Sequence, residues 1–162
     1  LRGKNTHSIL GYVHKPYPPI YAALCEKVGF NSALLIRGIE GGVVPSLRQK
    51  GLMISYHKGV EKARVDIDPK LLGINSELRA IAFPKRFENG KERALLAEHT
   101  VNLGHSALSG ESGLFYDGLV YSASLILWHL KQLKTLPAAA ERVREVLNSG
   151  RALNRLVTKK NH

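Results

Sequence analysis

The sequence predicts an α/β fold, one domain over residues 1–162 in which helices flank a β-sheet. Three observations lead to this prediction. A strand, helix and strand pattern opens the chain, two β-prone segments follow as a hairpin, and helical patterns dominate the remainder. A length of 162 residues is also typical of one domain with its own hydrophobic core.

The first unit is a strand, a helix and a second strand. Thr6–Val13 is β-prone, and the prolines at 16, 18 and 19 suit the entry to a helix. Ile20–Val28 is the predicted helix, and its apolar residues at 20, 24 and 28 predict one buried face. Ser32–Arg37 is the second strand, which we expect to run parallel to the first.

The stretch Ala33–Leu47 breaks from a buried strand into a glycine-rich loop, and the rest of the chain is organised around it. Ligands of open α/β sheets bind outside the carboxyl ends of such strands, and glycine lets a ligand approach the backbone. A tight turn without a ligand is an equally good interpretation of the local pattern. The candidate ligand loop consists of Arg37, Gly38, Glu40, Gly41 and Gly42.

Two short strands, Leu52–His57 and Lys62–Ile67, are joined by a predicted hairpin turn at Lys58–Glu61. Alternation in the second strand places residues 63, 65 and 67 on one face and residues 62, 64 and 66 on the other. The second face, with Lys50 and Lys58 nearby, is a candidate basic patch. An ordinary solvated face of a half-exposed strand pair is the alternative.

Residues 68–74 are a predicted turn with a short helical piece, and Asp66 and Asp68 are interpreted as structural caps. Residues 75–90 are predicted to be irregular. Four helices then follow, of which the second is the most apolar and is expected to cross the core. Their predicted ranges are Lys91–Leu108, Asp117–Leu133, Pro137–Leu147 and Arg151–Val157.

The charge is the strongest compositional signal, with 24 Lys and Arg residues against 13 Asp and Glu residues, a net charge of +11. Residues 1–64 hold ten basic and three acidic residues, and residues 151–162 hold four basic and no acidic residues. A basic surface of this size attracts polyanions such as nucleic acid. A solvated basic surface without a partner remains the alternative.

Several kinds of function find no support in the sequence. There is no Cys/His cluster with zinc spacing, no Walker loop and no Gly-x-Ser-x-Gly elbow, so we assign no catalytic and no metal residue. The seven histidines are scattered and are interpreted as surface or satisfied core residues. The single cysteine, Cys25, is expected in the core, and a chain without a cysteine pair is typical of the cytoplasm. No apolar run is long enough to span a membrane.

Five segments in order resemble the C-terminal α/β half of the anthranilate phosphoribosyltransferase family, glycosyltransferase family three. The resemblance covers essentially the whole chain and implies a mixed, mostly parallel sheet flanked by helices and preceded by a small helical domain. We therefore expect the chain to be part of a longer protein, with its own N-terminal helical half as a partner and a homodimer of the full-length protein left open. The segments are residues 10–14, 33–41, 108–113, 117–119 and 148–153.

The chain departs from the family in its central loop. The family typically has Gly-x-Asp/Glu-Gly-Leu-Asp-Glu, and the matching residues here are 38–44, with Val43 and Val44 in place of the Asp-Glu pair. In the family that pair helps to hold magnesium, which requires oxygen ligands that valine lacks. The loop is closer to a divergent branch of the family that is associated with binding nucleic acid without sequence preference.

We therefore expect a catalytically lapsed relative that binds DNA or RNA non-specifically and needs no cofactor. The alternative is a magnesium-dependent transferase of phosphoribosyl groups that needs its N-terminal half. A third interpretation is a scaffold half that exposes an apolar face and self-associates. The expected phosphate contacts are Arg37, Arg48, Lys50, Lys58, Lys62 and Arg64, with Arg151, Arg155, Lys159 and Lys160 as a second patch.

Overall fold

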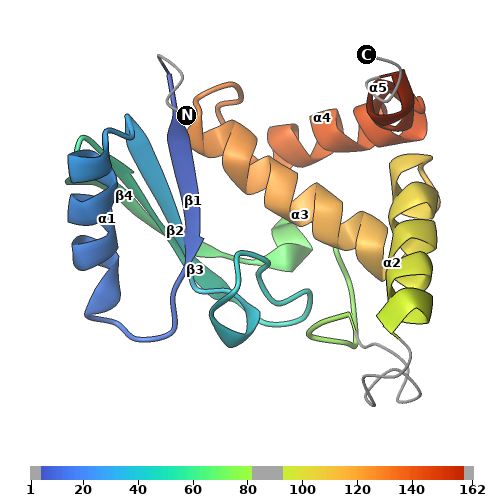
Figure 1. Cartoon of the computed structure of the whole chain (residues 1–162), viewed down its shortest axis with the longest axis horizontal. Coiled ribbons are helices and arrows are strands. Elements are labelled where there is room, and N and C mark those ends of the chain that lie inside the picture. The colour runs from blue at the N-terminus through green and yellow to red at the C-terminus, as the bar shows by residue number, and fades with distance from the viewer. Residues whose placement is uncertain (1–4, 82–92, 159–162) are drawn as a thin grey trace.

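A four-stranded mixed sheet forms the centre of the molecule, and its strand order is β1-β2-β3-β4 (Figure 1). The computed structural model describes residues 5–81 and 93–158. β1 and β2 are parallel, as the sequence predicts, whereas β3 is antiparallel to both β2 and β4. The described sheet is therefore mixed, as expected, but it is not mostly parallel, because β3 turns back along the chain as the first strand of a hairpin. The strands are His7–Gly11 (β1), Ser32–Ile36 (β2), Gly51–His57 (β3) and Val60–Ile67 (β4).

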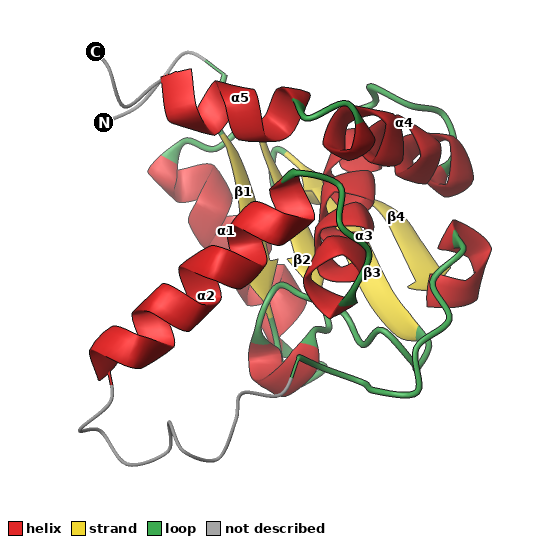
Figure 2. Ribbon diagram, turned by 90° about the vertical axis from the view of Figure 1, so that its right-hand side faces the viewer, coloured by secondary structure: helices red, strands yellow, loops and turns green. Residues whose placement is uncertain are grey.

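Helices cover both faces of this sheet, which confirms the predicted α/β architecture. α1 lies against one face, and α3 lies against the other (Figure 1). Figure 2 shows that α2, α4 and α5 are on the same side of the sheet as α3. The helices are Tyr17–Val28 (α1), Arg93–Leu108 (α2), Leu114–His129 (α3), Leu136–Asn148 (α4) and Arg151–Thr158 (α5), with short 3-10 turns at Ile39–Gly41 and Pro69–Leu72.

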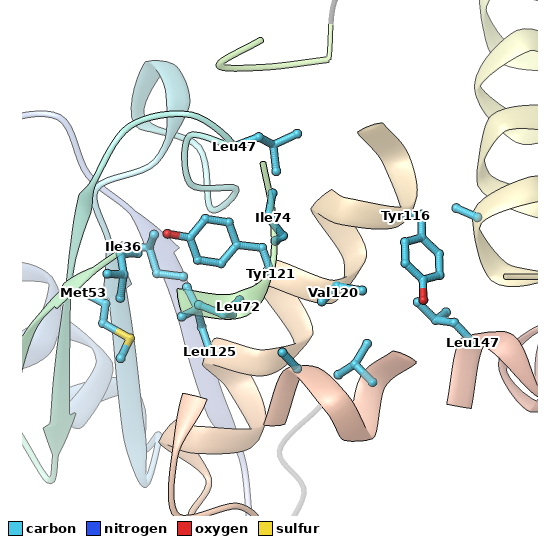
Figure 3. Packing of buried hydrophobic residues seen from close by; sticks show 14 of the residues in the cluster. Ile36, Leu47, Met53, Leu72, Ile74, Tyr116, Val120, Tyr121, Leu125 and Leu147 are labelled. Atoms are coloured by element: carbon cyan, nitrogen blue, oxygen red, sulfur yellow. The ribbon is translucent and has the colours of Figure 1, made fainter. Parts of the chain in front are cut away.

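The strand β2 is buried on both faces and divides the core in two. Leu34 and Ile36 face α3, where they join the larger cluster that includes Tyr121 and Leu125 (Figure 3). Ala33 and Leu35 face α1, on the side of the smaller cluster. All five residues of β2 are buried, which explains why the sequence shows a continuous apolar run there instead of alternation.

The predicted buried face of α1 is wrong. Ile20 and Leu24 are 60% and 59% exposed, and Val28 is also exposed, whereas Ala22 and Cys25 are buried against the sheet. Small side chains let a helix backbone approach the sheet closely, so the face with alanine and cysteine packs inward. The burial of Cys25 itself is confirmed.

The hairpin between β3 and β4 is tighter than predicted. Lys58 and Gly59 both have positive φ, 47° and 71°, as a two-residue type I′ turn requires. β4 therefore begins at Val60, two residues before the predicted start. A bulge at Ser55 and Tyr56 then shifts the register, so that Ser55 pairs with Ala63 while Tyr56 pairs with Glu61.

The boundaries of the later helices differ modestly from the prediction. α3 begins after Gly113 and ends at His129, instead of covering 117–133, because Lys131 adopts a left-handed conformation with φ of 57°. α4 and α5 match their predicted ranges to within a residue at each end. Residues 75–81 are irregular, as predicted, while residues 82–90 and the predicted start of α2 at Lys91 lie outside the described residues. None of the helices in the described residues is long and apolar enough to cross a membrane.

Candidate functional site

The glycine-rich loop after β2 folds back over the end of β1. A Cβ atom added to Gly11 would overlap the carbonyl oxygens of Gly41 and Gly42, and one added to Gly38 would overlap that of Gly42. Two backbone hydrogen bonds form within the loop. The N–H of Gly42 donates to the carbonyl oxygen of Ile39 (2.8 Å), and the N–H of Ile39 donates to the carbonyl oxygen of Val44 (2.9 Å). The glycines are therefore required for close backbone packing at the carboxyl ends of β1 and β2.

The loop presents one carboxylate and two apolar side chains to solvent. Glu40 is exposed and has left-handed backbone angles, with φ of 51° and ψ of 31°. Val43 and Val44 are 41% and 40% exposed. Val43 and Val44 do not have positive φ angles, so the left-handed residues of the loop are Glu40 and Gly41.

A cleft of about 820 Å³ lies beside the loop, where β2 ends and β3 begins. Arg37, Lys50 and Arg79 line it together with the backbone of Gly38 and a single carboxylate, Asp66. Arg37 is held at this edge because its backbone N–H donates to the carbonyl oxygen of Leu52 (2.9 Å). The cleft therefore gathers three cationic side chains and one anionic side chain from four separate segments.

Short local contacts shape the wall of the cleft between the loop and β3. The Ser46 hydroxyl oxygen accepts hydrogen bonds from the backbone N–H groups of Arg48 (3.3 Å) and Gln49 (3.0 Å). The backbone N–H of Leu47 donates to the carbonyl oxygen of Arg79 (3.0 Å). This last bond ties the irregular segment at 75–81 to the loop and brings Arg79 to the cleft.

The two carboxylates that were predicted to be structural caps, Asp66 and Asp68, have different roles. The Asp68 carboxylate accepts a hydrogen bond from the backbone N–H of Lys70 (3.0 Å), which confirms its capping role. It also forms an ion pair with Lys50 at 3.4 Å, although the Lys50 side chain is 78% exposed. Asp66 instead lines the cleft.

Beside the cleft, tyrosine and arginine side chains cluster on the α1 face of the sheet. The Tyr56 hydroxyl donates a hydrogen bond to Glu61 (3.1 Å), and burial together with this bond raises the pKa of Tyr56 to about 12. The Arg64 guanidinium donates two hydrogen bonds to Glu61, 3.0 and 2.9 Å long, and thereby lowers the pKa of Glu61. Burial raises the pKa of Tyr12, an effect partly offset by Arg37 and Arg64.

The structure does not gather the six basic residues of the first predicted patch into one cluster. Arg37 and Lys50 line the cleft, and Arg48 lies in an adjoining hollow with Glu77. Lys58 lies in the hairpin turn and Lys62 lies near the start of β4, roughly 20 Å from the cleft along the strands. Arg64 lies between these groups and is paired with Glu61.

The bulge in the hairpin also separates Lys62 from the face of β4 on which it was predicted. Because Lys62 is the extra residue between the two register positions, it lines a cavity near His129 of α3, whereas Arg64 points toward Tyr56 and Glu61. In the second predicted patch, Arg151 and Arg155 are exposed on α5. Lys159 and Lys160 lie outside the described residues.

Sequence reasoning missed two features that tertiary structure creates. Arg79 follows no local motif; it lines the cleft, and its carbonyl oxygen accepts a hydrogen bond from the backbone N–H of Leu47. His7, His57 and His129 are far apart in the chain but line one cavity at the amino ends of β1 and β2. No spacing in the sequence indicates this convergence, because it depends on strand order and register.

The side chains of the loop do not fit a magnesium site. Glu40 is the single carboxylate of the loop, and Val43 and Val44 have no side-chain oxygen. Among residues 5–81 and 93–158, no group of three or more His, Cys, Asp or Glu side chains is arranged to hold a metal ion. Magnesium requires several hard oxygen ligands, and this donor set does not supply them.

Sequence comparison finds a distant relative of this chain. No protein-family model matches the chain. It is 26% identical over 136 residues to an uncharacterized protein of Aquifex aeolicus, covering 83% of this chain and 39% of that protein. The chain thus spans about two-fifths of the length of this relative.

Solved structures of anthranilate phosphoribosyltransferases have the same fold. The enzyme from Saccharomyces cerevisiae in complex with 4-fluoroanthranilate superposes with a TM-score of 0.66 at 21% identity, covering 92% of this chain and 40% of that one. The enzyme from Thermus thermophilus gives a TM-score of 0.61 at 19% identity, covering 88% of this chain and 39% of that one. The expected resemblance in fold is confirmed.

Proposed function

We propose that this chain is the α/β part of a phosphoribosyltransferase-like protein that has lost its transferase activity and binds nucleic acid without sequence preference. The observation that carries the proposal is the cleft beside the glycine-rich loop. Arg37, Lys50 and Arg79 converge there, and Asp66 is the only carboxylate among the residues that line it. Such a set of cations favours a ligand with repeated negative charge.

The chemistry of this cleft suits a phosphate backbone. Arginine and lysine side chains contact phosphate oxygens through charge-assisted hydrogen bonds, and these contacts carry no base information. The backbone of Gly38 also lines the cleft, beside these cations. Binding through such contacts is indifferent to sequence and weakens steeply with salt.

The ion pair between Lys50 and Asp68 does not prevent Lys50 from taking part. Its nitrogen lies 3.4 Å from the Asp68 carboxylate, and its side chain is 78% exposed. Exposed pairs of this kind contribute roughly 0–1 kcal/mol, which a phosphate contact readily offsets. Lys50 can therefore turn from Asp68 to a phosphate at little cost.

The loop itself supports the loss of transferase activity. Where the related family carries an acidic pair that helps to hold magnesium, this chain carries Val43 and Val44. Phosphoribosyl transfer requires neutralisation of the charge that develops on pyrophosphate, for which a metal ion is the usual device. Glu40 alone is a poor substitute for that set of oxygen ligands.

A retained transferase activity is the second candidate, favoured by the shared fold with solved transferases. One of these is an anthranilate phosphoribosyltransferase from Saccharomyces cerevisiae in complex with PRPP and Mg. This candidate predicts that the full-length protein consumes phosphoribosyl pyrophosphate in the presence of magnesium. An assay in which the full-length protein shows no magnesium-dependent consumption would exclude it.

The test of the binding proposal is fluorescence anisotropy with labelled single-stranded and double-stranded DNA of several unrelated sequences. A variant with Arg37, Lys50 and Arg79 changed to alanine should lose at least about tenfold in affinity for all sequences alike. The matched control changes three exposed cations elsewhere, Lys27, Lys134 and Arg142, and removes the same total charge. Equal losses in the two variants would show that net charge acts rather than the cleft.

A further inference from the structure

A second cavity, of about 530 Å³, lies at the opposite end of the sheet from the cleft. It is bounded by the amino ends of β1 and β2, the end of β3 and the segment that follows α3. Its lining contains three histidines and two lysines: His7, His57, His129, Lys62 and Lys131. None of the residues that line it is Asp or Glu.

A chain of hydrogen bonds forms the floor of this cavity. The Ser32 hydroxyl lies 2.7 Å from Nδ1 of His7 and 2.7 Å from Nε2 of His129. The Ser55 hydroxyl lies 2.9 Å from Nδ1 of His129. Both ring nitrogens of His129 are thus engaged, so the ring is held in one orientation while His7 extends the chain to the surface.

Among the described residues, neither Lys62 nor Lys131 forms an ion pair, and no carboxylate lines the cavity. His129 is only 8% exposed, and burial together with the nearby His7 and His57 lowers its pKa to about 4. The buried ring of His129 therefore resists protonation beside the other two imidazoles. The electrostatic environment opposes a further positive charge and favours an anion.

The end of α3 would be expected to disfavour an anion, because a helix C-terminus carries partial negative charge. Here the last carbonyls are occupied: the backbone N–H groups of Leu130, Lys131 and Gln132 donate to the carbonyl oxygens of Ile126, Trp128 and Leu127. Lys131 closes the helix in a left-handed conformation that usually belongs to glycine. The chain thus places a cationic side chain at the position that terminates the helix.

Lys62 reaches the cavity because of the bulge in β4. It is the extra residue between the pairs Ser55–Ala63 and Tyr56–Glu61, and bulges commonly redirect a side chain in this way. Lys62 and Lys131 therefore approach one cavity from two different elements. Both residues are exposed, so their side chains are accessible to a ligand in solution.

We propose that this cavity is an anion site that takes a phosphate group, with Lys62 and Lys131 as the charged contacts and His7 and His57 as further donors. The phosphate belongs either to a small phosphate monoester or to the end of a nucleic acid strand. The chemistry is shared: a compact dianion is matched by ammonium groups and imidazole N–H groups. The site is separate from the cleft and does not depend on nucleic-acid binding there.

The test follows the imidazole resonances of the protein by NMR at about pH 6.5, near the ordinary histidine pKa, during titration with inorganic phosphate at constant ionic strength. Saturating shifts of the His7, His57 and His129 resonances are expected as phosphate binds. Lys62→Ala and Lys131→Ala should each weaken phosphate binding about tenfold. His105→Gln, which changes an exposed histidine on α2, and Arg37→Ala in the cleft should leave it unchanged.

The source of the phosphate is distinguished with one short oligonucleotide prepared with a 5′-phosphate and with a 5′-hydroxyl group. Displacement of inorganic phosphate by the phosphorylated form alone identifies a strand end as the ligand. Displacement by neither form, with inorganic phosphate bound, identifies a small phosphorylated compound. The proposal is overturned if the histidine resonances do not saturate, or if Arg37→Ala abolishes phosphate binding while Lys62→Ala does not.

Discussion

Gly11, the last residue of β1, lies directly against the backbone carbonyl of Gly41 in the loop that follows β2. A Cβ atom at Gly11 would overlap the carbonyl oxygens of both Gly41 and Gly42. These are backbone atoms, which cannot rotate away as a side chain could. The position of the loop, and with it the shape of the adjoining cleft, therefore depends on the absence of a side chain at Gly11.

Replacement of Gly11 by alanine should displace the loop and destabilise the protein by about 3 kcal/mol, as overpacking against a rigid neighbour does. Chemical denaturation measures the loss. The matched control is Gly104→Ala in α2, where an added Cβ meets nothing within 4 Å, so the change should stabilise the helix by up to about 1 kcal/mol. Similar effects of the two substitutions would contradict the described packing of the loop.

Truncation of an exposed leucine on α1 and of a buried leucine in the strand beneath it should affect stability very differently. Leu24 is 59% exposed, so Leu24→Ala should change the free energy of unfolding by no more than about 0.5 kcal/mol. Leu35 in β2 is fully buried under α1, and Leu35→Ala should cost about 2–5 kcal/mol. A large loss for Leu24→Ala, measured by urea unfolding, would mean that α1 packs through its leucine face after all.

The buried face of α1 could not be predicted from the sequence alone. Apolar residues recur every fourth position from Ile20 to Val28, and the same helix also carries small residues at Ala22 and Cys25. Periodicity detects both stripes, but only the space available beside the sheet decides which one packs inward. The strand–helix–strand unit and the hairpin were predictable because their signals are local: apolar runs, prolines and glycines.

The candidate site likewise has one part that the sequence predicts and other parts that it does not. The glycine-rich loop was predictable from residues 33–47 alone. Arg79 was not, because tertiary contacts such as the backbone bond from Leu47 to Arg79 bring it to the cleft. The separation of Lys62 from Arg64 was not predictable either, since a bulge of one residue interrupts the alternation.

The hydroxyl of Tyr121 has no hydrogen-bond partner among the described residues and is fully buried. Figure 3 shows the ring between Ile36 and Ile74, with its oxygen directed toward Ile36. Burial raises the pKa of Tyr121, as expected for a hydroxyl held away from water. Because an unpaired buried hydroxyl costs about 1–3 kcal/mol, Tyr121→Phe should leave stability unchanged or increase it by about 1 kcal/mol. A decrease in the midpoint of thermal unfolding would reveal a bound water or another partner.

His129 should make the stability of the protein depend on pH below neutrality. Its folded pKa of about 4 lies below the value near 6.5 of an unfolded chain, so between these values the unfolded chain binds more protons. The free energy of unfolding therefore falls as pH falls through this window, by about 2 kcal/mol between pH 7 and pH 5 from this residue. His129→Gln should remove that part of the slope. An identical slope in the variant and in the native chain would contradict the burial of a neutral imidazole.

The most direct test of the proposed function is the salt dependence of DNA binding by this chain and by its cleft variant with Arg37, Lys50 and Arg79 changed to alanine. The native chain should bind single-stranded DNA with an affinity that falls linearly as log salt rises. If the three side chains each contact a phosphate, the variant should lose about 2 from the magnitude of that slope, because each contact contributes about 0.7. An unchanged slope, or no binding at low salt, would contradict the account.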